Sequence, residues 1–236
     1  MRGRSGIRVT LCLLLSLFAP IAPPARASGE QAGGERAVAR EILARLEARL
    51  ARLRTMKGRF IQSFTSAGLG VPQTEEGTFF IKSPNLMRWE YERPEKKLAV
   101  CDGDHTWFYL PEEGVVYRGT AKEWREGGAF AVLVGGDLIS RYEAIGASAE
   151  EAGRPGNILL TMKPRGQSND FDSIEVEIDP RTLNIATLTA IDAMGNRIGL
   201  ALAGVEENVR LSEAAFVFSP PRGSRVIDQD SGAEER

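Results

Sequence analysis

The sequence has little cysteine and histidine: its 236 residues include two cysteines and one histidine. Cys12 lies in an N-terminal segment that we expect to be removed, so Cys101 alone would remain and no internal disulfide could form. We interpret Cys101 as a small apolar strand residue rather than a reactive thiol. His105 ends the run Asp102-Gly103-Asp104-His105. Asp and Gly are typical of turns, which favours an exposed turn over a metal or acid–base site.

The sequence also lacks the motifs of common catalytic centres. It contains no G-x-S-x-G, no H-E-x-x-H and no glycine-rich phosphate loop. Carboxylates are numerous, but a sequence cannot pair them across strands, so nothing points to hydrolysis by two acids. We therefore expect no catalytic, cofactor-binding or metal-binding residues, and a protein that is not an enzyme.

An excess of basic charge is absent as well. The whole chain has 30 basic and 32 acidic residues, and its first 27 residues hold four arginines and no acid. Removing that segment leaves 26 basic residues against 32 acidic ones, a net charge of −6. Nucleic-acid binding calls for a basic face, so we expect no nucleic-acid partner. After residue 27 there is no apolar run of the roughly 20 residues that a transmembrane helix needs.

The first 27 residues have the order of a secretory signal peptide. Three arginines within the first eight residues precede the mostly apolar run Val9–Ala22, and Ala25-Arg26-Ala27 supplies an A-x-A cleavage site. An uncleaved anchor is less favoured, because the apolar run is short for a membrane span. A lipid-anchored start is disfavoured because Cys12 lies inside the apolar run. We expect export and cleavage after Ala27.

Beyond the signal, apolar periodicity predicts a helix followed by strands. Residues 28–34 are small and polar and predict a disordered lead-in. An apolar stripe with spacings of three and four predicts an amphipathic helix over Glu35–Met56. From Phe60 the period changes to two, and glycine-rich Ala121–Ile139 interrupts the strands with one or two short helices. The predicted strands are Phe60–Phe64, Gly77–Lys82, Leu86–Glu92, Lys97–Cys101, Thr106–Leu110, Val115–Arg118, Tyr142–Ala147, Ile158–Lys163, Phe171–Ile178, Leu183–Ala193, Arg197–Glu206 and Ala215–Phe218.

Consecutive hairpin-linked strands predict an antiparallel sheet. A sheet of about 11 strands curls rather than stays flat, which makes one face concave. The two helical segments are the natural cover for that face. We expect one mainly β domain with some α-helix over residues 35–229, followed by a loose tail at 230–236.

Aromatic residues gather on the middle strands. Met87, Trp89 and Tyr91 alternate with polar residues and share one strand face, and Trp107 and Tyr109 share another. A large apolar face beneath a movable cover would suit an apolar ligand. From the residues alone, an ordinary core is the safer interpretation.

Four sequence blocks, in order over residues 60–229, resemble the periplasmic outer-membrane lipoprotein carrier family, the LolA-type proteins. Each block is weak by itself, but their order and spacing are fairly specific. They are Phe60-Ile61-Gln62; Glu76 to Tyr91, with Pro94 following; Cys101-Asp102-Gly103 through Trp107-Phe108-Tyr109; and Phe216 to Gly223, followed by Val226 and Asp228-Gln229.

The resemblance implies an incomplete antiparallel β-barrel with a helical lid over an apolar cavity. It implies a periplasmic monomer that takes acylated lipoproteins from an inner-membrane lipoprotein-releasing ABC transporter to an outer-membrane receptor. The acyl chains would lie in the cavity, and each buried methylene would contribute about 0.8 kcal/mol.

Lid and cavity residues are also implied by the resemblance. Well-studied members have an arginine before Pro-Asn that holds the lid shut, whereas Ser83 occupies that position here. A serine would make only a weaker, uncharged latch, and Arg88 or a helix arginine could compensate. The resemblance implies Leu50, Phe130 and Leu133 as lid residues and Met87, Trp89 and Tyr91 as residues of the cavity strand. The apolar patterns of the helix and the neighbouring strands add four more lid or cavity residues: Leu53, Phe79, Ile81 and Trp107.

Two other classes of function remain open. One is a relative of the same fold that binds another lipid or senses envelope stress. A receptor-type relative would carry a lipoprotein signal, which is missing, and a sensor would usually need a second domain. The other is an enzyme on this scaffold, which lacks a catalytic cluster.

Overall fold

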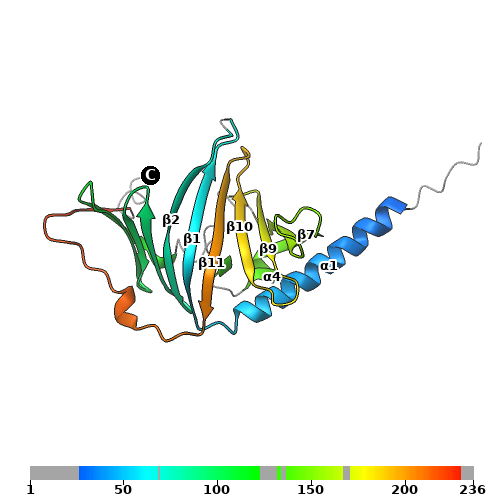
Figure 1. Cartoon of the computed structure of the whole chain (residues 1–236), viewed down its shortest axis with the longest axis horizontal. Helices are drawn as coiled ribbons and strands as arrows, with labels where there is room; N and C mark the ends of the chain where they lie inside the picture. The colour runs from blue at the N-terminus through cyan, green and yellow to red at the C-terminus, as the bar shows by residue number, and fades with distance from the viewer. Residues whose placement is uncertain (1–26, 69, 123–131, 134–136, 167–170, 230–236) are drawn as a thin grey trace, which may run out of the picture.

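The computed structural model describes residues 27–68, 70–122, 132–133, 137–166 and 171–229 (Figure 1). The predicted signal peptide, Phe130 and the predicted tail at 230–236 lie outside these ranges. Among the described residues, no helix combines the length and apolar character that crossing a bilayer requires.

The described elements follow the predicted order of one long helix, six strands, a short helix and further strands. The helices are α1 (Ala27–Leu50) and α4 (Leu138–Arg141), with a 3₁₀ helix, η1 (Glu213–Phe216). The strands are β1 (Thr55–Thr65), β2 (Gln73–Lys82), β3 (Leu86–Arg93), β4 (Lys97–Cys101), β5 (His105–Leu110), β6 (Val115–Thr120), β7 (Tyr142–Ser148), β8 (Ile158–Pro164), β9 (Ser173–Ile178), β10 (Ile185–Ile191), β11 (Arg197–Glu207) and β12 (Arg225–Asp228).

Within the described ranges, the strands form one open, curved sheet of twelve strands in the order β12-β6-β5-β4-β3-β2-β1-β11-β10-β9-β8-β7 (Figure 1). Neighbouring strands are antiparallel, apart from β12, which pairs with β6 in parallel. The predicted fold class is confirmed: the chain is mainly β, and its sheet is an incomplete barrel. The count of about 11 strands missed the short β12.

Helix α1 begins and ends earlier than predicted. It includes residues 28–34, so the prediction of a disordered lead-in is wrong. Ala, Glu and Gln in this stretch favour helix despite its glycines. The helix ends at Leu50, and Thr55 and Met56 belong to β1 because they pair with Lys82 and Ile81 of β2. Pairing across the sheet therefore overrides the helical spacing at this end.

The last predicted strand, Ala215–Phe218, is also wrong. Residues Glu213–Phe216 form η1, and the Ser212 side chain caps it by accepting a hydrogen bond from the Ala214 N–H. Phe216 is buried and Val217 is exposed. From η1 the chain passes Trp107 and Tyr109, whose rings Phe218 contacts, and β12 then pairs with β6; this segment is orange to red in Figure 1. The segment from Ser212 to Asp228 is called the C-terminal arm below.

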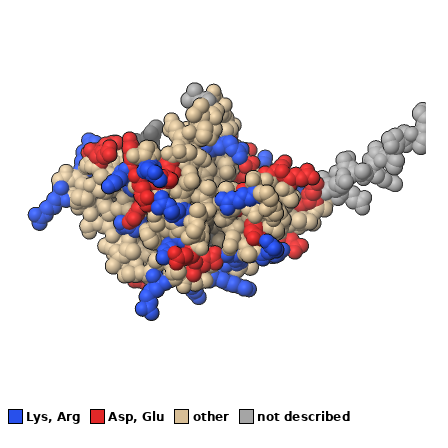
Figure 2. All heavy atoms as spheres, viewed as in Figure 1, with Lys and Arg blue, Asp and Glu red and all other residues tan. Residues whose placement is uncertain are grey.

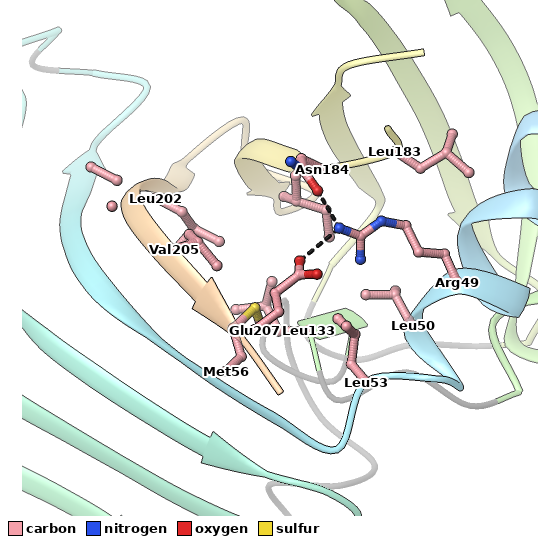
Figure 3. Close-up of a pocket in the computed structure, with 13 residues that line it drawn as sticks. Arg49, Leu50, Leu53, Met56, Leu133, Leu183, Asn184, Leu202, Val205 and Glu207 are labelled. Atoms are coloured by element: carbon pink, nitrogen blue, oxygen red, sulfur yellow. Dashed lines mark hydrogen bonds and ion pairs between the residues drawn. The ribbon is translucent and has the colours of Figure 1, made fainter. Parts of the chain in front are cut away.

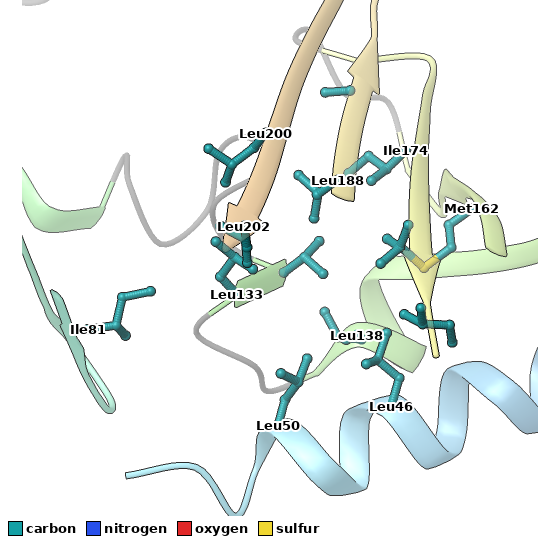
Figure 4. Close-up of a cluster of buried hydrophobic side chains, with 14 of the residues drawn as sticks. Leu46, Leu50, Ile81, Leu133, Leu138, Met162, Ile174, Leu188, Leu200 and Leu202 are labelled. Carbon is teal, nitrogen blue, oxygen red and sulfur yellow. The ribbon is translucent and has the colours of Figure 1, made fainter. Parts of the chain in front are cut away.

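The main core lies on the concave side of the sheet. Helix α1 packs against β7, β8 and α4, and its buried residues Leu46 and Leu50 point toward Leu133, Leu138 and the strands (Figure 4). One apolar face of the helix therefore covers part of the concave face, as its periodicity predicted. Most of the predicted helical insert at 121–139 lies outside the described residues, although α4 begins at Leu138.

Candidate functional site

A cavity of about 350 Å³ lies where the C-terminal end of α1 meets β11 and the turn between β9 and β10 (Figure 3). We call it the apolar cavity because most of its lining residues are aliphatic, although Arg49, Asn184, Glu207 and backbone groups make about half of its exposed surface polar. The lining residues are Arg49, Leu50, Leu53, Met56, Leu133, Leu183, Asn184, Ile185, Leu202, Ala203, Gly204, Val205 and Glu207.

A β-bulge in β11 turns Glu207 toward this cavity. Lys57 of β1 pairs with Glu206 and Arg59 pairs with Ala203, so one residue of β1 lies opposite two of β11. The extra residue reverses the alternation of side chains beyond it. Gly204, whose φ is +58°, supplies the left-handed conformation at the bulge. As a result, Glu207 faces the helix while Glu206 faces the outer side, where it pairs with Lys57 at 3.1 Å.

The turn between β9 and β10 forms the opposite wall. The Asp179 carboxylate accepts hydrogen bonds from the backbone N–H groups of Arg181 and Thr182, and these bonds hold the pKa of Asp179 below its usual value. Leu183 has a φ of +58°, which is rare for a bulky residue. This strained conformation places the Leu183 side chain in the cavity wall and leaves the Thr182 carbonyl facing α1.

Arg49 joins these two walls to the helix. Its Nη2 donates to Glu207 Oε1 at 2.6 Å and to Asn184 Oδ1 (Figure 3). Its Nε donates to the Thr182 carbonyl at 2.7 Å. The Arg49 and Glu207 side chains are 20% and 30% exposed, so the ion pair is partly buried. We call Arg49 with these three partners the Arg49 clamp. It fixes the C-terminal end of α1 over the mouth of the cavity.

The structure brings together most of the predicted lid and cavity residues. Leu50, Leu53 and Leu133 line the cavity. Phe79, Ile81, Met87 and Trp89 are buried in the same apolar core as the inner face of α1, with Tyr91 packed against them. Their inward orientation follows from strand alternation. Whether these residues hold a ligand is untested and stays a prediction.

The aromatic part of this core is closely packed. Phe60 meets Trp89 and Tyr91 edge-on, each at a centroid distance of 5.0 Å, and Phe79 stacks on Trp89 at 5.2 Å. The Tyr91 hydroxyl donates to Gln62 at 2.9 Å. Burial, and to a lesser extent the nearby Glu75 carboxylate, raise the pKa of Tyr91. Tyr91 therefore stays neutral at physiological pH and adds no charge to the concave face.

The prediction that Trp107 lines the cavity is wrong. Its ring lies 5.7 Å from that of Phe218 in the C-terminal arm, and its indole N–H donates to Asp102 at 2.8 Å. The next residue, Phe108, packs against the main core instead. Trp107 and Tyr109 thus belong to the outer face beneath the arm.

The structure places the two predicted latch residues on different partners. Arg88 lies on the outer side of β3, where it donates to Glu90 at 2.6 Å and to the Ala215 carbonyl at 3.2 Å. It therefore ties η1 to the sheet, and its prediction as a lid latch is wrong. Ser83 contacts the connection after α1 through its backbone N–H, which donates to the Arg54 carbonyl at 2.9 Å. Arg49 ties the helix to the sheet through an ion pair, beside the weaker ties of Arg45 to the Pro180 carbonyl and of Glu47 to the Ile139 N–H. The sequence identified Arg49 only as one of several helix arginines.

Outside this cavity, the cysteine and histidine that the sequence analysis considered lie in the core and beside a turn. In the described ranges, no three His, Cys, Asp or Glu side chains cluster closely enough to hold a metal ion. Cys101 is fully buried in the core, and His105 is exposed beside the turn at Asp102. Burial raises the pKa of Asp102, but hydrogen bonds from Trp107, His105 and Asp104 outweigh it and leave the pKa below its usual value.

Known proteins resemble this chain over most of its length. An outer-membrane lipoprotein carrier protein of Azotobacter vinelandii is 31% identical over 225 residues, which cover 94% of this chain and all of the relative. A protein of the same name from Chromobacterium violaceum is 28% identical over 212 residues, covering 89% of this chain and 99% of the relative.

The fold also has a solved counterpart. The crystal structure of an uncharacterized conserved protein from Thermus thermophilus superposes with a TM-score of 0.51 at 15% identity, covering 81% of this chain and 99% of that one. Residues 51–219 match the family described as outer membrane lipoprotein carrier protein LolA. The chain therefore belongs to the outer membrane lipoprotein carrier protein LolA family, a family of binding proteins and not of enzymes.

Proposed function

We propose that this protein carries lipoproteins across the periplasm by enclosing their acyl chains beneath α1. It receives them from an inner-membrane ABC transporter and delivers them to an outer-membrane receptor. The observation that supports this proposal is the apolar cavity between the end of a covering helix and a concave sheet. The family names of the relatives point to the same class of cargo.

The size of the cavity indicates that the helix must move. Ligand pockets usually measure about 300–1,000 Å³, and this one lies at the lower end, at about 350 Å³. Several acyl chains need more room than that. Each methylene that enters gains about 0.8 kcal/mol, which favours an open, loaded state over the closed one. The cargo thus drives α1 outward by binding the open state better.

Removal of the signal peptide is part of this proposal. Cleavage after Ala27 would release a chain that moves between the two membranes as a monomer. The cleavage position coincides with the first residue of α1, so the mature chain would begin at the covering helix itself.

A transfer assay tests the proposal. Mature protein is mixed with membranes that hold an acylated lipoprotein and the transporter, and lipoprotein in the soluble fraction is measured. We expect a soluble one-to-one complex. Extraction of free lipid without lipoprotein would contradict the proposal and favour a lipid-binding relative of the same fold.

A matched pair of variants locates the uptake site. Leu133 lines the cavity and is 3% exposed, whereas Ile139 on α4 is 42% exposed. Leu133→Glu should abolish uptake, because a carboxylate would enter an apolar wall, and Ile139→Glu should leave it intact. A thermal melt of each variant separates lost binding from lost folding. Equal uptake by a folded Leu133→Glu variant would place the cargo elsewhere.

A further inference from the structure

A second recess, which we call the outer recess, adjoins the apolar cavity between the end of α1 and the turn that joins β9 to β10. It measures about 490 Å³ and shares Arg49, Leu53, Leu183 and Glu207 with the cavity. Arg45, Ala48, Arg52 and Thr182 complete its lining. The Arg49 clamp therefore forms the boundary between the two spaces, and any chain that leaves the cavity on this side must cross the outer recess.

The outer recess carries unbalanced positive charge. Three arginines and one glutamate line it, and Glu207 is already paired with Arg49. Arg45 donates to the Pro180 carbonyl at 3.2 Å, a neutral partner. Among the described residues, no ion pair joins Arg45 or Arg52 to a carboxylate. Figure 2 shows basic side chains projecting along the lower edge of the molecule, where α1 ends.

This local charge contrasts with the rest of the protein. Without its first 27 residues the chain has a net charge of −6, yet the mouth of the cavity presents two arginines whose charge is not balanced in the recess. Arginine presents a planar fork of N–H donors that matches a carboxylate in geometry. A ligand with apolar chains at one end and carboxylates at the other would match both spaces at once.

We propose that the outer recess binds acidic residues of the cargo polypeptide next to its acylated residue. This inference rests on the proposed function, because an acylated protein is the ligand whose polypeptide must leave the cavity. The acyl chains lie in the apolar cavity, and the first residues of the polypeptide pass between Arg45 and Arg52. The site therefore favours lipoproteins that carry Asp or Glu close to the acylated end.

Synthetic lipopeptides test this preference. Three probes share one acylated cysteine and differ in the four residues that follow it, which are acidic, neutral or basic. We expect the wild-type protein to bind the acidic probe roughly two- to tenfold more tightly than the neutral one, because two exposed ion pairs each contribute modestly. Raising the salt concentration should reduce the preference, because salt screens exposed charges.

The variant Arg45→Gln with Arg52→Gln should bind the three probes equally. The matched control is Arg36→Gln with Arg40→Gln, which makes the same charge change on exposed positions of the same helix outside the recess. The control should keep the wild-type preference. Equal probe affinities in the wild type, or the same loss of preference in both double variants, would overturn the proposal.

Further outcomes distinguish binding of lipid phosphate from binding of an acidic peptide, and failure of this inference from failure of the proposed function. If wild type binds phosphatidylglycerol vesicles as well as the acidic probe, and only the recess variant loses that binding, the recess recognises lipid phosphate and the peptide proposal is wrong. If no acylated probe binds, the proposed function itself fails and the inference falls with it. Loss of preference with retained neutral-probe binding supports the recess specifically.

Discussion

The Arg49 clamp leads to a prediction about the opening of α1. Replacing Glu207 with glutamine keeps the size of the side chain and an oxygen acceptor for Arg49, but removes its charge. We expect the end of α1 to open more often, while the fold stays intact. The clamp acts on the helix, so the effect should be confined to α1 and the cavity beneath it.

The magnitude follows from the geometry. Arg49 stays charged in the variant and still donates to the glutamine oxygen, so the loss is the attraction between two opposite charges. That attraction contributes about 0.2–1 kcal/mol in exposed ion pairs. The 2.6 Å bond joins side chains that are 20% and 30% exposed, so solvent screens this pair less than a fully exposed one. A loss of about 1 kcal/mol is reasonable, which corresponds to about a fivefold larger open population.

Hydrogen exchange measures this change directly. Amides in the C-terminal half of α1 should exchange about fivefold faster in Glu207→Gln, because local opening governs their exchange. The control is Glu206→Gln, the neighbouring carboxylate, which pairs with Lys57 on the sheet at 3.1 Å and is 59% exposed. The control should leave exchange in α1 unchanged. Equal exchange in both variants, or acceleration spread evenly over the strands, would refute the role of the clamp.

Three further predictions concern stability. Gly77→Ala should cost about 3 kcal/mol or more, because the added Cβ would lie 1.9 Å from the Glu90 carbonyl oxygen. The control Gly146→Ala, whose Cβ would meet no atom within 4 Å, should change stability by less than about 0.5 kcal/mol. Urea unfolding of both variants measures the two effects. Phe216→Ala should cost about 3–5 kcal/mol, because it empties a buried position within the C-terminal arm. The exposed neighbour Val217→Ala should cost less than about 0.5 kcal/mol in the same assay. Asp102→Asn should lower stability at pH 7 by less than about 1 kcal/mol. Because the folded pKa of Asp102 is lowered, its contribution exists above the ordinary value of about 3.9 and disappears as the pH falls through the folded pKa, so urea unfolding at falling pH should show variant and wild type converging below about pH 3.9.

Local patterns predicted the elements better than their ends. The predicted strand Lys97–Cys101 matches β4 residue for residue, and the apolar stripe through Leu46 and Leu50 covers the core. The errors occur where distant pairing decides the structure. Met56 continues a helical spacing but pairs with Ile81, and the short β12 exists because β6 accepts it as a partner.

The candidate site was predictable in its apolar part only. Alternation indicates which side chains share a face, and it correctly grouped Met87 with Trp89. It does not say which face is inside, so Trp107 was assigned to the wrong side. The Arg49 clamp depends on a bulge before Glu207 and on a left-handed residue at Leu183. Neither feature has a local pattern that would have indicated it.

The C-terminal arm also determines what the open sheet exposes at its β6 end. An unclosed sheet presents unpaired N–H and C=O groups at each edge strand, and such edges template the addition of strands from other molecules. Here α1 packs against β7 at one end. At the other end, β12 covers β6 and becomes the edge itself, with only four residues that include Arg225 and Asp228. Short, charged edges resist self-association, so the arm lets the sheet remain open without favouring polymerisation.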